Sequence, residues 1–409
     1  MKNKMLLMLS ILFCFALADE FVDSKTTVGG YGELHYDMKG NDGDGKLDFH
    51  RFIVYFKHNF NSQWSLMSEV EIEHNMVGSE SALGYKGGYV AMEQAYLNYW
   101  NGKWGFKGGV LLVPAGITNE YHEPPTFMSV ERPEYNKYII PTTWFDNGFA
   151  FYGAMGDFNW NFTMTGDMNG DEIGAGIRDA RMKGFGSSTS DWTKTFQASW
   201  TGMDGVKLGG SMTMNDAPVS DTVVESADGY WMTEISGGCD WDSGLEADCL
   251  LGPDGIGADD VNTDVDESAD NGYWIAPSSN LVYVDPVEGS TTENDPIGVT
   301  LMEINGTYSK NNMYARFEYG TIDYDNNSVE SSSGYYVDLG YNVADMMGCD
   351  GDLYVWTRSS SYSKDDDGDA KDISLFGVTY KPLNNVSFKF ETGESGDADV
   401  MRMGLGYMF

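Results

Sequence analysis

Asp399-Val-Met-Arg-Met-Gly-Leu-Gly-Tyr-Met-Phe409 is the stretch of sequence that decides the fold. In an extended strand, successive side chains point to opposite faces. One face of this strand would be apolar and aromatic, with Met401, Met403, Leu405, Tyr407 and Phe409. The other face would be small or polar, with Val400, Arg402, Gly404, Gly406 and Met408. A strand of about ten residues with one face suited to lipid and one to water is typical of a transmembrane β-barrel.

The opposite end of the sequence predicts export. Lys2 and Lys4 precede an apolar run over residues 5–15 and small residues at 16–18. This pattern predicts a signal peptide over residues 1–18. A short membrane anchor is the alternative, but the apolar run is shorter than the roughly 20 residues that a spanning helix needs. A mature chain that enters the membrane therefore has to do so as a closed barrel.

Alternating runs of about ten residues, separated by turn signals, predict 16 strands. An even number brings both ends of a single-chain barrel to the same side. The connections between these strands are alternately tight and long. Transmembrane barrels have this alternation because their periplasmic turns are short and their extracellular loops are long. A soluble β-sandwich or propeller would not require it. The predicted strands are 26–38, 47–60, 64–76, 89–100, 103–113, 143–156, 158–168, 192–202, 206–215, 299–309, 312–324, 334–343, 352–362, 372–382, 386–394 and 398–409. The fold class is thus all-β, a transmembrane antiparallel barrel in the outer membrane of a Gram-negative bacterium.

Within most predicted strands, charged side chains share one face, which we assign to the lumen. Examples are Glu69, Glu71 and Glu73 in one strand and Arg316 and Glu318 in another. A charge on the lipid-facing side costs about 2–4 kcal/mol at mid-depth, so the face that carries repeated charges must be wet. The strand 47–60 is the exception, because its histidines and its basic residues fall on opposite faces.

The charge of the chain is strongly negative, with 63 acidic and 25 basic residues and a net charge of −38. This excludes nucleic acid as a natural partner. Residues 216–298 hold 20 of the acids and no Lys, Arg or His, and they form the longest predicted extracellular loop. Cys239 and Cys249 lie within this loop, and export permits disulfides, so we predict that they form one. Cys349 would remain unpaired.

The third long connection, residues 114–142, differs from the other loops. It contains five prolines through Pro141 and apolar residues such as Phe127, Ile139 and Ile140, which would be out of place in water. We therefore expect it to fold inward against the barrel wall. A rigid extracellular cap is the alternative.

Several motifs in the first half of the chain resemble the phosphate-selective porin O and P family. They are Gly32-Glu-Leu-His35, Asp48-Phe-His-Arg51, Glu69-Val-Glu-Ile-Glu73, Glu93-Gln-Ala-Tyr96, Asn119-Glu-Tyr-His-Glu-Pro-Pro-Thr-Phe127, Val130-Glu-Arg-Pro133 and Lys137-Tyr-Ile-Ile-Pro-Thr-Thr-Trp144. The resemblance is specific through about residue 185 and implies a 16-stranded porin, usually a homotrimer, whose third loop constricts the pore. A terminal Phe409 resembles the signal read by the outer-membrane barrel assembly machinery. The predicted partners are therefore this machinery, lipids and lipopolysaccharide, and small hydrophilic solutes.

Acidic residues outnumber basic ones among the candidate pore residues, which predicts a general or cation-preferring pore for passive diffusion. One alternative is an anion- or phosphate-selective porin, because a local ring of basic residues can outweigh distant acidic charge. Another is a surface structural or adhesion protein that uses the barrel only as an anchor. The candidate lumen and constriction residues are Glu33, His35, Arg51, Glu69, Glu71, Glu73, Glu93, Lys107, Glu120, His122, Glu123, Glu131, Arg132, Lys137, Arg178, Arg181, Arg316 and Lys389.

No catalytic or cofactor motif appears in the sequence. There is no Gly-x-Ser-x-Gly elbow and no His-Glu-x-x-His helix, so we expect neither an enzyme nor a cofactor. Acidic clusters such as 365–369 lack the complete spacing of a calcium loop, so no metal site is predicted. Strand alternation places His74 opposite Glu69, Glu71 and Glu73, which argues against a metal site there as well.

Overall fold

The computed structural model describes residues 25–38, 45–75, 77, 88–224, 226, 230–234, 250–251, 280–284, 289–366 and 368–409. Two compact units divide the chain. The first comprises residues up to Val219 together with Asp295–Phe409, and the second comprises Ser220–Asn294. The predicted signal peptide, Cys239 and Cys249 lie outside the described residues.

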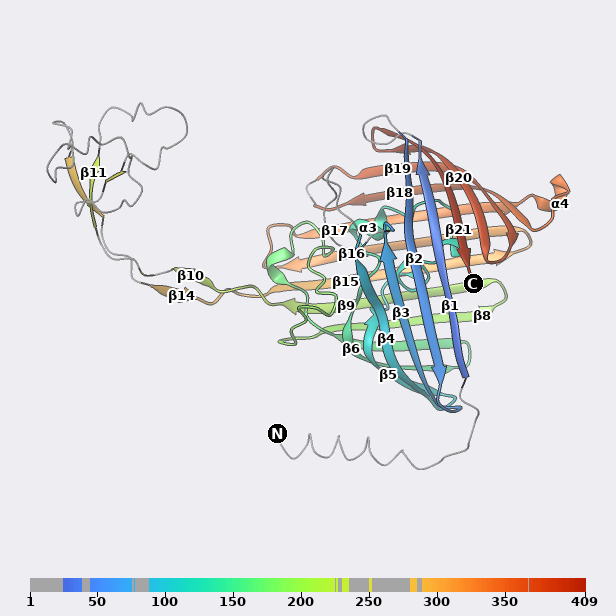
Figure 1. Ribbon diagram of the computed structural model, residues 1–409, viewed down its shortest axis with the longest axis horizontal. Helices are drawn as coiled ribbons and strands as arrows, with labels where there is room; N and C mark the ends of the chain where they lie inside the picture. The colour runs from blue at the N-terminus through green and yellow to red at the C-terminus, as the bar shows by residue number, and fades with distance from the viewer. Residues whose placement is uncertain are drawn as a thin grey trace. The chain divides into compact units, whose positions relative to one another are not determined.

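The first unit is a closed antiparallel barrel of 16 strands, which confirms the predicted fold (Figure 1). The strands follow one another in chain order, and β1 closes the barrel by pairing with β21. Their bounds are β1 (Lys25–Asp37), β2 (Lys46–Asn59), β3 (Trp64–Glu73), β4 (Val90–Trp100), β5 (Trp104–Leu112), β6 (Phe145–Met155), β7 (Phe158–Thr165), β8 (Thr193–Met203), β9 (Val206–Ala217), β15 (Ile297–Lys310), β16 (Met313–Asp325), β17 (Ser331–Asn342), β18 (Asp352–Ser363), β19 (Lys371–Leu383), β20 (Val386–Ser395) and β21 (Ala398–Met408).

Both ends of each of the 16 barrel strands lie within three residues of their predicted positions. We call the two ends of the barrel the turn end, where the tight connections lie, and the loop end, where the long connections lie. The connection between β17 and β18 lies at the turn end and contains a short helix, α4 (Ala344–Met347), followed by the exposed thiol of Cys349. Among the described residues, no helix is long and apolar enough to cross a membrane.

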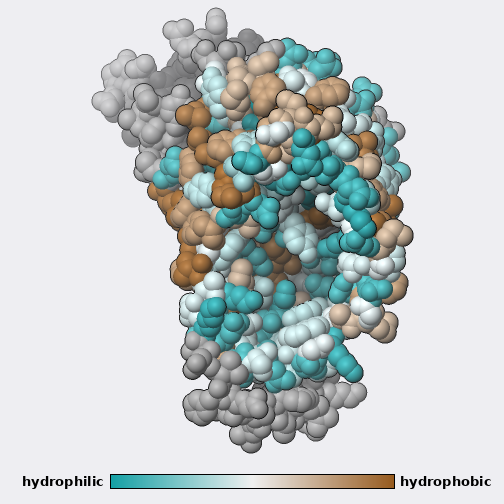
Figure 2. All heavy atoms as spheres, turned by 90° about the vertical axis from the view of Figure 1, so that its right-hand side faces the viewer, coloured by the Kyte–Doolittle hydropathy of each residue, from teal (hydrophilic) through white to brown (hydrophobic). Residues whose placement is uncertain are grey.

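Apolar side chains cover the outer surface of the barrel, and polar side chains point inward. In β16, for example, Phe317 and Tyr319 are exposed while Arg316 and Glu318 are buried. Seen from the turn end, hydrophilic side chains surround the hollow centre of this face (Figure 2). This is the alternation that lipid outside and water inside require.

Two β-bulges change which side chains enter the lumen. Glu33 pairs with Arg51 but Leu34 pairs with Phe49, so His50 is the extra residue of β2. As a result His50 and Arg51 line the same cavity, which explains why strand 47–60 does not show two clean faces. Glu93 is the corresponding extra residue of β4, because Glu69 pairs with Gln94 and Val70 with Met92. A bulge changes the direction of a side chain in this way, and it leaves one residue of the strand without a partner in the hydrogen-bond ladder.

The connection between β5 and β6, residues 113–144, is here called the inner segment. It contains the short helices α2 (Ile117–Glu120) and α3 (Tyr135–Tyr138) and the 3₁₀ turn η1 (Pro124–Thr126). Its apolar side chains pack into one buried cluster with inward side chains of β15 to β19 and with Ile173 and Ile177, which follow the 3₁₀ turn η2 (Gly170–Glu172). This burial explains why the inner segment, although it is a connection between two strands, is rich in apolar residues.

In the described residues of the second unit, the regular structure consists of short strands. β10 (Thr222–Val224) pairs with β14 (Ser290–Thr292), and β11 (Tyr230–Glu234) pairs with β12 (Leu250–Leu251) and β13 (Asn280–Val284). This unit occupies most of the acidic connection between β9 and β15.

The ion pair of Arg358 with Asp338 inside the barrel is buried on both sides. Arg358 of β18 donates to Asp338 of β17 through two nitrogens, at 2.6 and 2.7 Å, and both residues are at most 2% exposed. Replacing Arg358 by Met would leave the Asp338 carboxylate buried without its partner, so we expect a loss of about 3–5 kcal/mol of folding free energy. Urea titration of the protein folded into lipid vesicles measures this loss. The exposed pair of Lys310 and Asp204 supplies the control, since Lys310→Met should leave the urea midpoint unchanged. Equal stability of both variants would contradict the prediction.

Candidate functional site

The inner segment is held inside the barrel by hydrogen bonds from wall strands far away in the sequence. The ammonium of Lys389 (β20) donates to the backbone oxygens of Pro124 and Ser129, both at 2.7 Å. The carboxylate of Glu391 accepts from the backbone N–H of Val130 at 2.7 Å. Further along the wall, Arg316 (β16) donates to the hydroxyl of Thr118 at 2.9 Å. Strands β16 and β20 of the barrel wall therefore hold the inner segment through backbone groups of residues 124–130 and the side chain of Thr118.

Two glycines of the terminal strand make room for this segment. A Cβ atom at Gly406 would stand 2.4 Å from Cβ of Pro124, and one at Gly404 would stand 3.0 Å from a methyl group of Val130. Both distances are shorter than normal carbon contacts, which are about 3.5–4.0 Å. The small inward face of β21 thus has a packing reason, since any larger side chain would collide with the inner segment.

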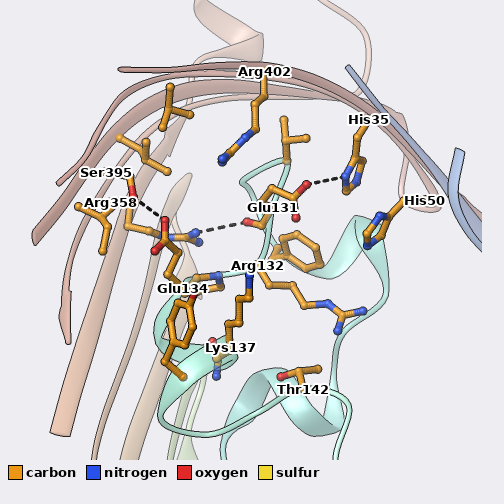
Figure 3. A pocket seen from close by; sticks show the side chains of 18 of the residues that line it. His35, His50, Glu131, Arg132, Glu134, Lys137, Thr142, Arg358, Ser395 and Arg402 are labelled. Carbon is orange, nitrogen blue, oxygen red and sulfur yellow. Dashed lines mark hydrogen bonds and ion pairs between the residues drawn. The ribbon is translucent and has the colours of Figure 1, made fainter. Parts of the chain in front are cut away.

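A cavity of about 480 Å³ lies beside the inner segment, near the loop end (Figure 3). Strands β1, β2 and β18–β21 form one side, and residues 127–142 of the inner segment form the other, together with Arg178. The charged residues that line it are Glu33, Arg51, Glu131, Arg132, Glu134, Lys137, Arg178, Arg358, Lys371 and Arg402, together with His35 and His50. Seven of these are Arg or Lys and three are Glu, so the cavity has an excess of positive charge.

Four of the seven cations are paired with carboxylates. Arg51 contacts Glu33 at 2.7 Å, Lys371 contacts Glu134 at 2.9 Å and Arg402 contacts Glu391 at 3.1 Å, in addition to the pair formed by Arg358. The carboxylates of the cavity are also used, because both ring nitrogens of His35 face one, Glu131 at 2.8 Å and Glu33 at 3.1 Å. Each acidic residue that lines the cavity therefore has a basic or imidazole partner.

The other three cations, Arg132, Lys137 and Arg178, form no ion pair within the described part of the chain. In Figure 3, the side chains of Arg132 and Lys137 extend without a marked partner. Burial, followed by the nearby guanidinium of Arg51, lowers the pKa of Arg132. Burial and the charge of Arg178 likewise lower the pKa of neighbouring Arg181 to about 10. Both pKa shifts arise first from burial, which disfavours the charged form of a guanidinium, and second from a neighbouring guanidinium.

The structure divides the sequence-predicted residues into four groups. The cavity receives Glu33, His35, Arg51, Glu131, Arg132, Lys137 and Arg178. A buried group beside it contains Glu69, Glu71, Glu93 and His122, and the contacts between wall and inner segment use Arg316 and Lys389. Glu73, Lys107, Glu120, Glu123 and Arg181 lie elsewhere and are partly buried; Lys107 lies over the ring of Tyr96, and Glu120 accepts a hydrogen bond from Gln197 at 2.5 Å.

Sequence reasoning missed His50, Glu134, Arg358, Lys371 and Arg402 as cavity residues. Two of them had a usable signal, because strand alternation places Arg402 on the inward face of β21 and Arg358 on the same face as Trp356 and Ser360. His50 had none, since it enters the cavity through a bulge.

Comparison with known proteins supports the fold. No family model matches the chain. A protein of Aquifex aeolicus (strain VF5), described as an uncharacterized protein, is 28% identical over 413 residues, which cover 95% of this chain and 81% of that protein. Among solved structures, the anion-selective porin from Comamonas acidovorans has a TM-score of 0.53 at 9% identity, covering 95% of this chain and all of the porin. The fold is that of a porin.

Two further solved structures agree. OmpF of Salmonella typhi, in complex with daunomycin, has a TM-score of 0.53 at 10% identity and covers 94% of this chain and 97% of OmpF. A loop L8 deletion mutant of OmpT, an outer membrane protein of Vibrio cholerae, has a TM-score of 0.51 at 13% identity and covers 95% of this chain and 100% of the mutant. These identities show a shared architecture and leave the solute open.

Proposed function

We propose that the protein is an outer-membrane porin, a water-filled channel through which small hydrophilic solutes or ions diffuse passively. The observation that carries this proposal is the inner segment, which lies inside a closed 16-stranded barrel and leaves a charged cavity beside it. A barrel of this size is wide enough for an aqueous channel, so the transport properties depend on what narrows the lumen. The turn end would face the periplasm and the loop end the cell exterior.

The ion preference depends on local charge, and here the geometry favours the anion-selective alternative. Net charge and acidic candidates predict cation preference. The cavity, however, presents Arg132, Lys137 and Arg178 without carboxylate partners, while Glu33 is already paired with Arg51 and Glu131 with the ring of His35. Because charges are screened beyond about 8 Å at physiological salt, the side chains lining the passage outweigh distant acidic residues. We therefore propose a preference for small anions. Phosphate, which the resemblance to the porin O and P family suggests, is one candidate.

The same proposal includes the setting of the protein. Outer-membrane lipids and lipopolysaccharide would surround the apolar outer surface, and Phe409 would be presented to the barrel assembly machinery. A homotrimer is supported by the resemblance and by the OmpT structure in its trimer form, which has a TM-score of 0.50.

Single-channel recording in a planar bilayer under a potassium chloride gradient tests the proposal. We expect stepwise conductance and a reversal potential whose sign shows chloride preference. Potassium preference would refute the anion proposal and support the charge-based expectation. Added phosphate that lowers the chloride current at low concentration would identify phosphate as a substrate.

Deleting residues 220–294 separates a porin from a surface anchor. The second unit is compact by itself and joins the barrel through Val219 and Asp295. We expect the barrel without it to conduct as the full chain does. Absence of conductance in the folded full-length protein would favour the surface structural or adhesion hypothesis.

A further inference from the structure

Three buried side chains from three separate elements face one another between the barrel wall and the inner segment. Glu69 belongs to β3, Glu93 is the bulge residue of β4, and His122 follows α2. They are 2%, 0% and 2% exposed, and one potential ligand atom from each lies within 4.8 Å of the others. No part of the proposed channel function uses this group.

The distances from the ring of His122 to the two carboxylates are too long for hydrogen bonds. His122 Nε2 lies 3.6 Å from Oε2 of Glu93 and 3.8 Å from Oε1 of Glu69. A hydrogen bond between nitrogen and oxygen measures about 2.7–3.2 Å. Nε2 of His122 and Oε2 of Glu93 have no hydrogen-bond partner among the described residues, although both are buried. Buried polar atoms are almost always paired, so these two call for a ligand between them.

The second ring nitrogen of His122 and the second carboxylate oxygen of each glutamate form hydrogen bonds with other groups. Nδ1 of His122 donates to the backbone oxygen of Asn119 at 3.1 Å, which leaves the lone pair of Nε2 directed at the two glutamates. The other oxygen of Glu93 accepts from the Thr143 hydroxyl, and that of Glu69 accepts from the Gln94 amide. Metal-binding side chains are typically oriented by outer partners of this kind.

We propose that Glu69, Glu93 and His122 bind a divalent transition-metal ion, such as zinc, which fastens the inner segment to the barrel wall. Bonds of about 2.0–2.1 Å from one ion to its ligands in a tetrahedral arrangement separate the ligand atoms by about 3.3–3.4 Å. The observed separations of 3.6 and 3.8 Å exceed this value by a few tenths of an ångström, so small side-chain movements would bring the ligands to bonding distance. Two carboxylates and one divalent ion sum to zero charge, which removes the cost of burying two negative groups. One imidazole and two carboxylates suit zinc and similar metals, and a water would complete the coordination.

A second acidic and histidine group in the barrel does not have these features. Asp48 already pairs with His50 at 3.2 Å and with His74 at 2.9 Å, so its oxygens are used in hydrogen bonds. The two groups therefore provide a matched comparison within one chain.

The experiment is a zinc chloride titration of the folded, EDTA-treated protein by calorimetry, with metal content after desalting as a second readout. We expect one zinc ion per chain. His122→Gln and Glu93→Gln should each weaken zinc binding at least about 100-fold, since losing even an outer partner costs 10–100-fold. His74→Gln, in the comparison group, should leave affinity and stoichiometry unchanged.

Heat-dependent gel migration shows whether each variant forms the barrel. If His122→Gln does not fold, the nearly isosteric Glu69→Gln and Glu93→Gln variants decide. Absence of zinc binding by the unaltered protein would overturn the proposal, and so would equal binding by a folded His122→Gln variant. The titration does not depend on whether the barrel conducts.

Discussion

Replacing Arg132, Lys137 and Arg178 together by Glu should reverse the ion preference of the channel. These cations line the cavity without carboxylate partners, so the triple substitution changes the local charge by six units. The potential from a few unit charges in a narrow, low-dielectric passage amounts to several kT. We therefore expect the chloride-to-potassium permeability ratio to fall at least about tenfold, equivalent to ~1.4 kcal/mol. The reversal potential in a potassium chloride gradient measures the change.

The control changes the same total charge away from the cavity. Lys25, Lys103 and Lys310 are exposed and lie at or next to the turn-end limits of β1, β5 and β15. Their triple replacement by Glu should shift the reversal potential much less. Equal shifts in the two triple variants would show that overall charge, and not this cavity, determines the selectivity.

Gly406→Val should widen the pore by displacing the inner segment. The new Cβ atom would lie 2.4 Å from Cβ of Pro124, and valine is otherwise well suited to a strand. The backbone of β21 cannot move far, because β21 is bonded to both neighbouring strands, so the inner segment has to move instead. We expect single-channel conductance to rise about twofold or more, since conduction depends on what narrows the lumen. Larger fluctuations of the current should accompany it.

Gly174→Val is the matched control, because a Cβ at Gly174 meets nothing within 4 Å. Its conductance should equal that of the unaltered protein. If a correctly folded Gly406→Val variant also conducts normally, the inner segment does not set the conductance.

The barrel could be predicted from the sequence because its signal is local. Each strand alternates between lipid and lumen, and each turn has its own residues, so short windows were sufficient for all 16 strands. The inward positions of Glu33, Arg316 and Lys389 follow from the same alternation.

The arrangement of the site could not be predicted in the same way. A β-bulge adds one unpaired residue to a strand, and nothing in the sequence marks its position. One bulge turns His50 toward the cavity, and another places Glu93 next to His122. The balance of charge also depends on pairing. Counting acidic residues predicts a cation pathway, whereas the pairing of Glu33 with Arg51 and of Glu131 with His35 leaves the cations of the inner segment uncompensated.

The contacts of Lys389 with the inner segment have a consequence for the order of assembly. Lys389 lies 265 residues from Pro124 in the chain, and the glycines that receive the segment lie in the last strand. Contacts so distant in sequence form late, because a long stretch of chain must first be organised. The inner segment can reach its final position only after β20 and β21 are in place. A newly made barrel would thus pass through a stage with a wide lumen, and its narrowing would report that the last strands have closed.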